Sequence, residues 1–157
     1  MLVTTTEFDK LVLAALIANV AAGNFKGPLE AAQVGLYQNQ INPSKASTLA
    51  DLGELDAANV PGYARVPIQP FTPAFNESDG SQTMVSAQCA FSCTGAPAAP
   101  QDCWGMFVVQ TGAPDVLLAA EIFPQKFTFG RVGDGFALSV SWNERGLNPR
   151  TLTTELS

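Results

Sequence analysis

The N-terminal stretch of the chain carries apolar residues at helical spacing. Five of them recur at intervals of three and four, namely Phe8, Leu11, Val12, Ala15 and Leu16. Thr4 and Glu7 have the Thr-x-x-Glu spacing of a capping box, and Gly23 follows the stripe. This pattern predicts one helix over residues 5–21. Because its apolar stripe is wide, we expect the helix to pack against the body of the protein or against a neighbouring molecule.

The rest of the chain has the pattern of short strands separated by turns. Apolar and polar residues alternate at every second position in 83–93 and again in 136–142, which predicts two strands. Residues 104–110 and 116–123 are two apolar runs joined by a loop with Gly and Pro, and they predict a hairpin.

Weaker signals predict the remaining elements. Short strands are expected at 34–39, 63–68 and 126–129, and Pro67 limits the second of these to a sheet edge or a strand end. A short helix is expected in 47–55, with Ser47 as its N-cap and Asp51 in its first turn. Pro70 and Pro73 predict an irregular stretch, Ser78–Ser81 a turn, and 94–102 a surface loop.

The two alternating strands predict a shared core. Their inward positions are Val85, Cys89, Phe91, Phe136, Leu138, Val140 and Trp142. About seven short strands with turns between them are typical of an antiparallel β-sandwich or jelly roll. The expected fold is therefore mainly β with an N-terminal helix, in a single domain over residues 1–157 with a polar C-terminal tail at 143–157.

Composition narrows the classes of partner. Charged residues make up 14% of the chain, against about 25% in an average domain, so we expect partners to cover part of the surface. The net charge is −6 and basic residues form no cluster, which argues against direct nucleic-acid binding. The apolar run 11–18 is far shorter than the roughly 20 residues of a membrane span, and the acids Glu7 and Asp9 argue against a secretory signal.

The three cysteines are the first candidates for chemistry. Cys89 and Cys93 share one strand face, about 13 Å apart at 3.3 Å per residue, which is too far for a disulfide between them. Core positions are the favoured interpretation, and a disulfide from Cys103 to another cysteine or another chain stays open. Metal binding is disfavoured because the chain has three cysteines and no histidine.

The absence of histidine also excludes Ser-His-Asp and Cys-His catalysis. The acids Asp51, Glu54 and Asp56 are best explained as a solvated face, and residues 130–135 as a turn. We predict no catalytic, cofactor-binding or metal-binding residue, and hence no enzyme. An exposed Trp or Tyr would indicate a sugar-binding platform: Trp142 is favoured as a core residue by its strand face, and Trp104, beside the loop, stays open.

A longer sequence pattern, over residues 34–123, resembles that of a known group of proteins. An LYxN strand, a polar turn with Pro, a TLADL segment and a GYAR strand follow one another in the chain at Leu36, Tyr37, Asn39, Pro43, Thr48, Leu49, Ala50, Asp51, Leu52, Gly62, Tyr63, Ala64 and Arg65. An aromatic-glycine strand from Trp104 to Val109 and an LLAAExF strand from Leu117 to Phe123 continue it. Residues 34–123 thereby resemble small structural virion proteins of tailed bacteriophages, such as head decoration proteins.

The resemblance implies a function without catalytic residues. A decoration or cement protein of this kind is located in the virion and binds the major capsid protein and copies of itself, with a trimer at a local threefold point as one arrangement. The helix 5–21 and the tail 143–157 are then the parts expected to reach a neighbour. Two alternatives remain: a tail, baseplate or connector component, and a carbohydrate-binding module for host attachment. The three cysteines depart from the family pattern.

Overall fold

The computed structural model describes residues 3–4, 31–68, 71–76, 81–143 and 153–155. Within these residues the protein is mainly β, all strand pairs are antiparallel, and the mainly antiparallel β architecture expected from the sequence is confirmed. The helix predicted over 5–21, the turn at 78–80 and most of the tail lie outside the described residues. Near its end the predicted tail contains a strand, Thr153–Glu155.

The largest sheet, sheet A, has five strands. Their order across the sheet is β1 (Val3–Thr4), β8 (Val116–Phe129), β7 (Gln101–Gln110), β2 (Ala32–Tyr37) and β3 (Val66–Pro67). The predicted hairpin of β7 and β8 is confirmed. Strand β3 is the edge, as Pro67 indicated, because proline has no N–H to give to a further strand.

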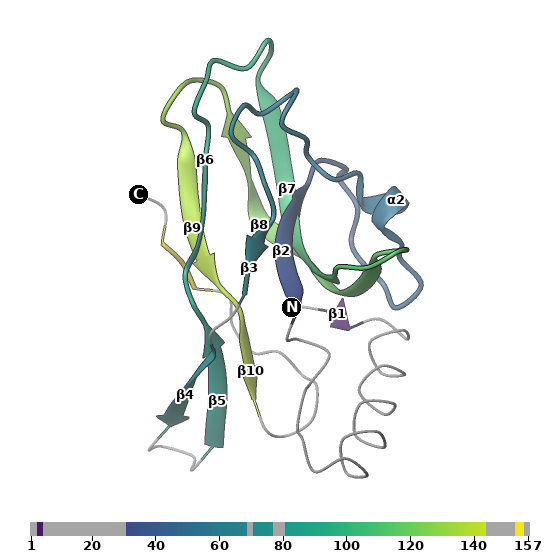
Figure 1. Ribbon diagram of the computed structural model, residues 1–157, viewed down its shortest axis with the longest axis vertical. Coiled ribbons are helices and arrows are strands. Elements are labelled where there is room, and N and C mark those ends of the chain that lie inside the picture. The colour runs from purple at the N-terminus through teal and green to yellow at the C-terminus, as the bar shows by residue number, and fades with distance from the viewer. Residues whose placement is uncertain (1–2, 5–30, 69–70, 77–80, 144–152, 156–157) are drawn as a thin grey trace.

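Two smaller sheets complete the fold. Sheet C consists of β11 (Thr153–Glu155), β9 (Gly135–Ser139) and β6 (Cys89–Ser92). Sheet B consists of β10 (Ser141–Asn143), β5 (Ser81–Ser86) and β4 (Phe71–Asn76). Figure 1 shows β4, β5 and β10 extending away from the end of the body formed by the other strands.

Each of the two long alternating strands is in fact two strands. The stretch 83–93 divides into β5 and β6, and 136–142 divides into β9 and β10, each half in a different sheet. The buried side chain of Ser86 fixes the break, since its Oγ accepts a hydrogen bond from the Val140 amide at 2.9 Å and donates one to the Ala87 carbonyl at 2.7 Å. Alternation continues through the bend, so period-two spacing does not reveal it.

Three further predictions were wrong in their boundaries. Residues 126–129 are the end of β8, because the strand continues beyond Pro124 after a register shift opposite Trp104. Pro73 lies inside β4, at the edge of sheet B, where no ladder N–H is required. Gln101 and Asp102 belong to β7 and not to the preceding loop.

The predicted short helix is confirmed but is four residues long, α2 (Leu49–Leu52). Thr48, and not Ser47, is its N-cap: the Thr48 side chain accepts from the Asp51 amide, and the Asp51 carboxylate accepts from the Thr48 amide at 2.8 Å. Gly53, at φ 65°, ends the helix in a left-handed conformation that glycine adopts without a Cβ clash.

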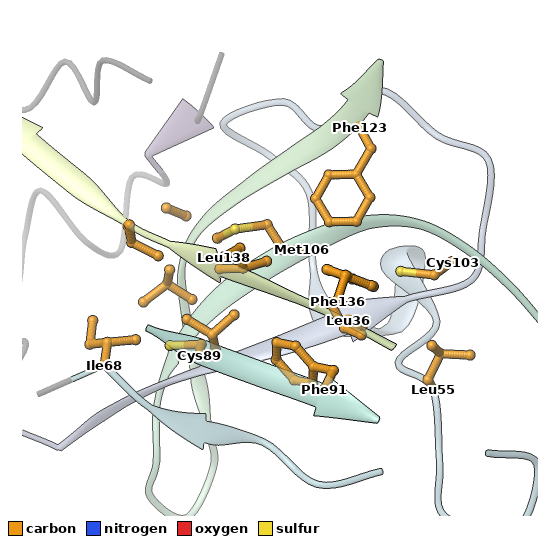
Figure 2. Close-up of a cluster of buried hydrophobic side chains, with 14 of the residues drawn as sticks. Leu36, Leu55, Ile68, Cys89, Phe91, Cys103, Met106, Phe123, Phe136 and Leu138 are labelled. Atoms are coloured by element: carbon orange, nitrogen blue, oxygen red, sulfur yellow. The ribbon is translucent and has the colours of Figure 1, made fainter. Parts of the chain in front are cut away.

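The main core lies between sheets A and C (Figure 2). Leu36 and Met106 from sheet A and Cys89, Phe91 and Leu138 from sheet C are buried in one cluster. Of the predicted core positions, Cys89, Phe91, Phe136, Leu138 and Val140 are confirmed. Val85 is only half-buried and lies outside the cluster. The Trp142 side chain falls outside the part that the structure describes.

A second core covers the opposite face of sheet A. It contains Tyr37, Leu52, Phe107, Val109, Leu117 and Ala120. Leu52 belongs to α2, so the segment with α2 lies over the outer side of the sheet (Figure 1). The run of buried residues in β7 follows from this arrangement, because a strand covered on both faces needs apolar residues at consecutive positions.

Two cross-strand pairs join an aromatic ring to a glycine. Gly35 lies opposite Phe107, and Gly105 lies opposite Tyr37. A Cβ on Gly35 would be 2.8 Å from both Cε1 and Cε2 of Phe107, and one on Gly105 would be 2.5 Å from Cε1 of Tyr37. Each glycine is therefore required by the ring that lies over it.

Candidate functional site

Among the residues that the structure describes, Arg65 is the one basic side chain that forms ion pairs with two acids. The Arg65 guanidinium donates to both carboxylate oxygens of Glu54, from Nε to Oε1 at 2.8 Å and from Nη2 to Oε2 at 2.6 Å. Its remaining terminal nitrogen donates to Asp115 Oδ2 at 2.6 Å. We call Glu54, Arg65 and Asp115 the arginine cluster. Their side chains are 20–29% exposed, so the cluster is partly shielded from water.

Three separate segments supply the arginine cluster. Glu54 follows α2 and forms an isolated β-bridge with Tyr37, Arg65 directly precedes β3, and Asp115 directly precedes β8. Tyr63 adds a hydroxyl that donates to Glu54 at 3.0 Å and accepts from the Leu36 amide at 2.9 Å. The cluster thus ties the segment that covers sheet A to the edge strand β3 and to the start of β8.

An aromatic ring supports the guanidinium. The guanidinium carbon of Arg65, Cζ, is 5.6 Å from the centre of the fully buried Phe107 ring. At this distance a cation and an aromatic ring attract one another. The same ring lies against Gly35. Arg65 therefore closes the second core as well as pairing with two acids.

Within the arginine cluster, hydrogen bonds favour the charged forms of Asp115 and Arg65. The hydrogen bond from Arg65, together with that from the Gly112 amide, lowers the pKa of Asp115. The carboxylates raise the pKa of Arg65, chiefly through the hydrogen bonds to Glu54. Burial raises the pKa of Tyr63, so its phenol stays protonated. A general acid or base needs a pKa near the working pH, and these shifts move Asp115 and Arg65 away from it.

A hollow of about 660 Å³ lies next to the arginine cluster. The stretch from Lys45 to Ala50 forms one wall and that from Pro114 to Leu117 the other. Three of its polar side chains are engaged within the protein: Thr48 bonds with Asp51, Asp115 with Arg65, and the Ser47 hydroxyl accepts from the Ser44 amide at 2.9 Å. No aromatic residue is among those that line it, so it offers no surface for stacking a sugar ring or a base.

The three cysteines are free and buried, which confirms the core interpretation and shows no disulfide within the chain. Each thiol donates to a nearby backbone carbonyl: Cys89 to Ala87, Cys93 to Gly95 and Cys103 to Gly105. Burial raises the pKa of Cys103 to about 12 and raises that of Cys89 as well. A reactive cysteine has a lowered pKa, so Cys103 and Cys89 are structural.

The remaining acids with lowered pKa values organise loops. Asp134 accepts from the amides of Gly130 and Arg131 in the turn before β9, and Asp51 caps α2. Asp102 accepts from Lys126 and Thr128 across β7 and β8. Across the described ranges, no three His, Cys, Asp or Glu side chains come together as a possible metal site.

Trp104 is half-buried and packs against the second core. The Lys126 ammonium is 5.7 Å from the centre of its ring. Part of the ring is therefore committed to the core and part to a cation, which argues against the sugar-binding platform that an exposed Trp104 would have indicated.

Sequence reasoning did not find the arginine cluster. The sequence predicts Glu54 on a solvated face with Asp51 and Asp56, and it shows Arg65 only as part of the GYAR strand. The available signal was a lone arginine directly before the edge strand β3 in a chain with few charges, since a charge beside buried strands needs a partner. The identity of that partner, 50 residues away for Asp115, is not visible in the sequence.

In the part of the chain with assigned structure, no helix combines the length and the apolar character needed to cross a membrane. No protein-family model, curated protein or solved structure matches this chain.

Proposed function

We propose that this protein is a structural subunit of a tailed-bacteriophage virion, and that it decorates the head by bridging subunits of the major capsid protein. The proposal includes contacts with copies of itself and no catalytic turnover. It starts from the resemblance of residues 34–123 to small virion proteins.

One observation carries the structural role. Among the described residues, the polar groups with the greatest potential for chemistry are engaged in holding the fold. Arg65 donates hydrogen bonds to Glu54 and Asp115. The three thiols donate to backbone carbonyls. Asp51 caps a helix, and Asp134 accepts from the backbone of a turn. A protein whose task is to keep its shape under load needs such internal anchoring and does not need a free nucleophile or base.

We further propose that sheets A and C form a β-sandwich of the jelly-roll kind. Their facing residues share the main core, and α2 and its flanking segment cover the outer face of sheet A. Such layered packing suits a rigid module that is bound at many equivalent positions. Interiors packed at crystal-like density deform little, so the module transmits force between its neighbours.

The low charged fraction supports a partner-covered surface. Only 14% of the residues are charged. With so few charges, much of the surface carries no like charge that would keep two copies of the protein apart. A protein that binds the assembled shell and not its dissociated subunits stabilises the shell by mass action, and repetition over many sites multiplies the effect.

The experiment is to prepare particles that lack the protein and to challenge them with heat and low salt. Particles without it should release their DNA at a lower temperature than wild-type particles, and adding the purified protein back should restore the wild-type value. As a control, protein unfolded by the substitution Gly105→Leu should restore nothing. Particles that are as robust without the protein as with it would move the assignment to the tail or baseplate.

A further inference from the structure

The turn between β8 and β9 presents an apolar side chain to solvent. Among the described residues, Val132 is the one large hydrophobic side chain that is mostly exposed, at 60%. Its neighbour Arg131 is 87% exposed. We call these two residues the knob. Single apolar residues on a surface are common, so exposure alone does not make the knob a binding element.

Hydrogen bonds on both sides of the knob hold the turn rigid. The Asp134 carboxylate accepts from the amides of Gly130 at 2.8 Å and Arg131 at 2.9 Å. The Gly133 amide donates to the Cys93 carbonyl at 2.8 Å, and the Cys93 amide donates to the Asp134 carbonyl at 2.8 Å. A turn that is already rigid loses little conformational freedom when it binds a partner, which favours binding.

The hollow next to the arginine cluster has the walls that such a knob requires. Its volume of about 660 Å³ is within the range of protein pockets that bury a ligand, roughly 300–1,000 Å³. Leu49, Pro114, Val116 and Leu117 give it apolar sides. Seating the Val132 side chain among them would remove apolar surface from water on both partners, and this removal favours association.

The charges at the hollow suit a cation. The arginine cluster combines one base with two acids, so its net charge is −1. Asp51 adds one negative charge, because its carboxylate is bonded to Thr48 in the wall, and Lys45 in the wall adds one positive charge. The sum remains negative. Within the described residues the two terminal nitrogens of Arg131 have no acceptor, so they are available to such a surface.

The knob and the hollow lie at opposite ends of β8. Val116 and Leu117 line the hollow at the start of the strand, and the turn follows Phe129 at its end. A strand of 14 residues extends over roughly 40 Å at 3.3 Å per residue. Figure 1 shows the connection from β8 to β9 at the top of the body, and α2, which contributes to the other wall, at its right-hand side. The knob therefore cannot occupy the hollow of its own copy.

We propose that the knob of one copy docks in the hollow of a second copy. Val132 packs among the apolar walls, and Arg131 points to the acids beside the hollow. Because the knob and the hollow are different surfaces, the contact is head to tail and joins each copy to the next. The inference rests on the part of the proposed function that includes contacts between copies, and it names the two surfaces that make them.

Chemical crosslinking between two cysteine variants tests the contact. Val132→Cys places a thiol on the knob and Ala50→Cys places one at the hollow, whereas the three native thiols are buried. A short bismaleimide should join a mixture of the two variants into covalent dimers, in which mass spectrometry finds position 132 linked to position 50. Ala90→Cys, exposed on β6, is the matched control and should give several-fold less dimer with Val132→Cys.

Sedimentation velocity gives a second readout. The wild type should associate as its concentration rises, and Val132→Asp should weaken this association several-fold, whereas Ala90→Asp should leave it unchanged. Both sites are exposed, so both variants should fold, which circular dichroism checks.

The outcomes decide between the proposed contact and other arrangements. A wild type that stays monomeric at every concentration would overturn the inference. Position 132 linked to itself, or to position 90 as often as to position 50, would overturn it as well. Because purified protein is used, such a result leaves the virion assignment to the experiments on particles.

Discussion

Substituting Gly35 by alanine should destabilise the protein because of the ring that crosses this residue. An ideal Cβ on Gly35 would be 2.8 Å from two carbons of the Phe107 ring, whereas carbon atoms pack at about 3.5–4.0 Å. The ring has little room to retreat, since it is fully buried and has the Arg65 guanidinium carbon 5.6 Å from its centre. Gly35→Ala must therefore displace the ring, the strand, or both.

The magnitude follows from two opposing effects. Overpacking a buried site costs typically about 1–3 kcal/mol, and the overlap with several ring carbons places Gly35→Ala in the upper part of that range. Replacing glycine by alanine inside a strand returns roughly 0.5–1 kcal/mol of backbone entropy. The expected net loss is about 2 kcal/mol in the free energy of unfolding, which urea titration followed by circular dichroism measures directly.

Two controls test whether the Phe107 ring causes the loss of stability in Gly35→Ala. Gly130→Ala should change the unfolding free energy by less than about 0.5 kcal/mol, because its Cβ would meet nothing closer than an Asp134 oxygen at 3.7 Å. In a Phe107→Leu background Gly35→Ala should cost far less than in the wild type, giving a coupling of about 1 kcal/mol or more. A loss below about 0.5 kcal/mol for Gly35→Ala alone, or no coupling, would refute the reasoning.

Three further predictions concern the arginine cluster, the main core and the thiols. Arg65→Met should lower the unfolding free energy by about 1–3 kcal/mol at neutral pH, with the 87%-exposed Arg131 giving a matched control, Arg131→Met, of less than about 0.5 kcal/mol. Because the pKa of Asp115 is lowered in the folded state, its contribution to the unfolding free energy is present above about pH 4 and is lost as the pH falls through the folded-state pKa. The Arg65→Met variant should therefore lose less stability on acidification than the wild type does. An equal loss in both proteins would contradict the pairing. Phe136→Ala should cost about 3–5 kcal/mol in urea titration, since four other phenylalanine rings surround Phe136, whereas the half-buried Ser139 tolerates alanine within about 0.5 kcal/mol; a cost under 1 kcal/mol at Phe136 would show that the core is placed wrongly. A thiol reagent at pH 8 should label none of the three cysteines rapidly in the native protein and all three after unfolding, and rapid labelling of Cys103 would contradict its burial.

Sequence pattern was sufficient for the inward faces of several strands. Alternation placed Cys89, Phe91, Phe136 and Leu138 correctly in the core, because the side-chain period of a strand is set by backbone geometry alone. The hairpin of β7 and β8 was also predictable, since two apolar runs flank a Gly- and Pro-containing loop.

Strand breaks and long-range pairs were not predictable for a physical reason. A strand that bends at Ala87 from one sheet into another keeps its alternation, so β5 and β6 looked like one element. The register shift in β8 opposite Trp104 depends on the partner strand. The arginine cluster depends on segments that only the fold brings together, and no local spacing relates Glu54 or Asp115 to Arg65.

The virion assignment is tested most directly by the number of copies of this protein in a purified particle, measured by quantitative mass spectrometry against the major capsid protein. A decoration protein that binds equivalent positions over the shell should be present in a fixed ratio to the capsid subunits, in hundreds of copies. A number that matches one symmetric ring would contradict head decoration and place the protein in the connector, tail or baseplate. Absence from the particle would contradict the structural assignment altogether.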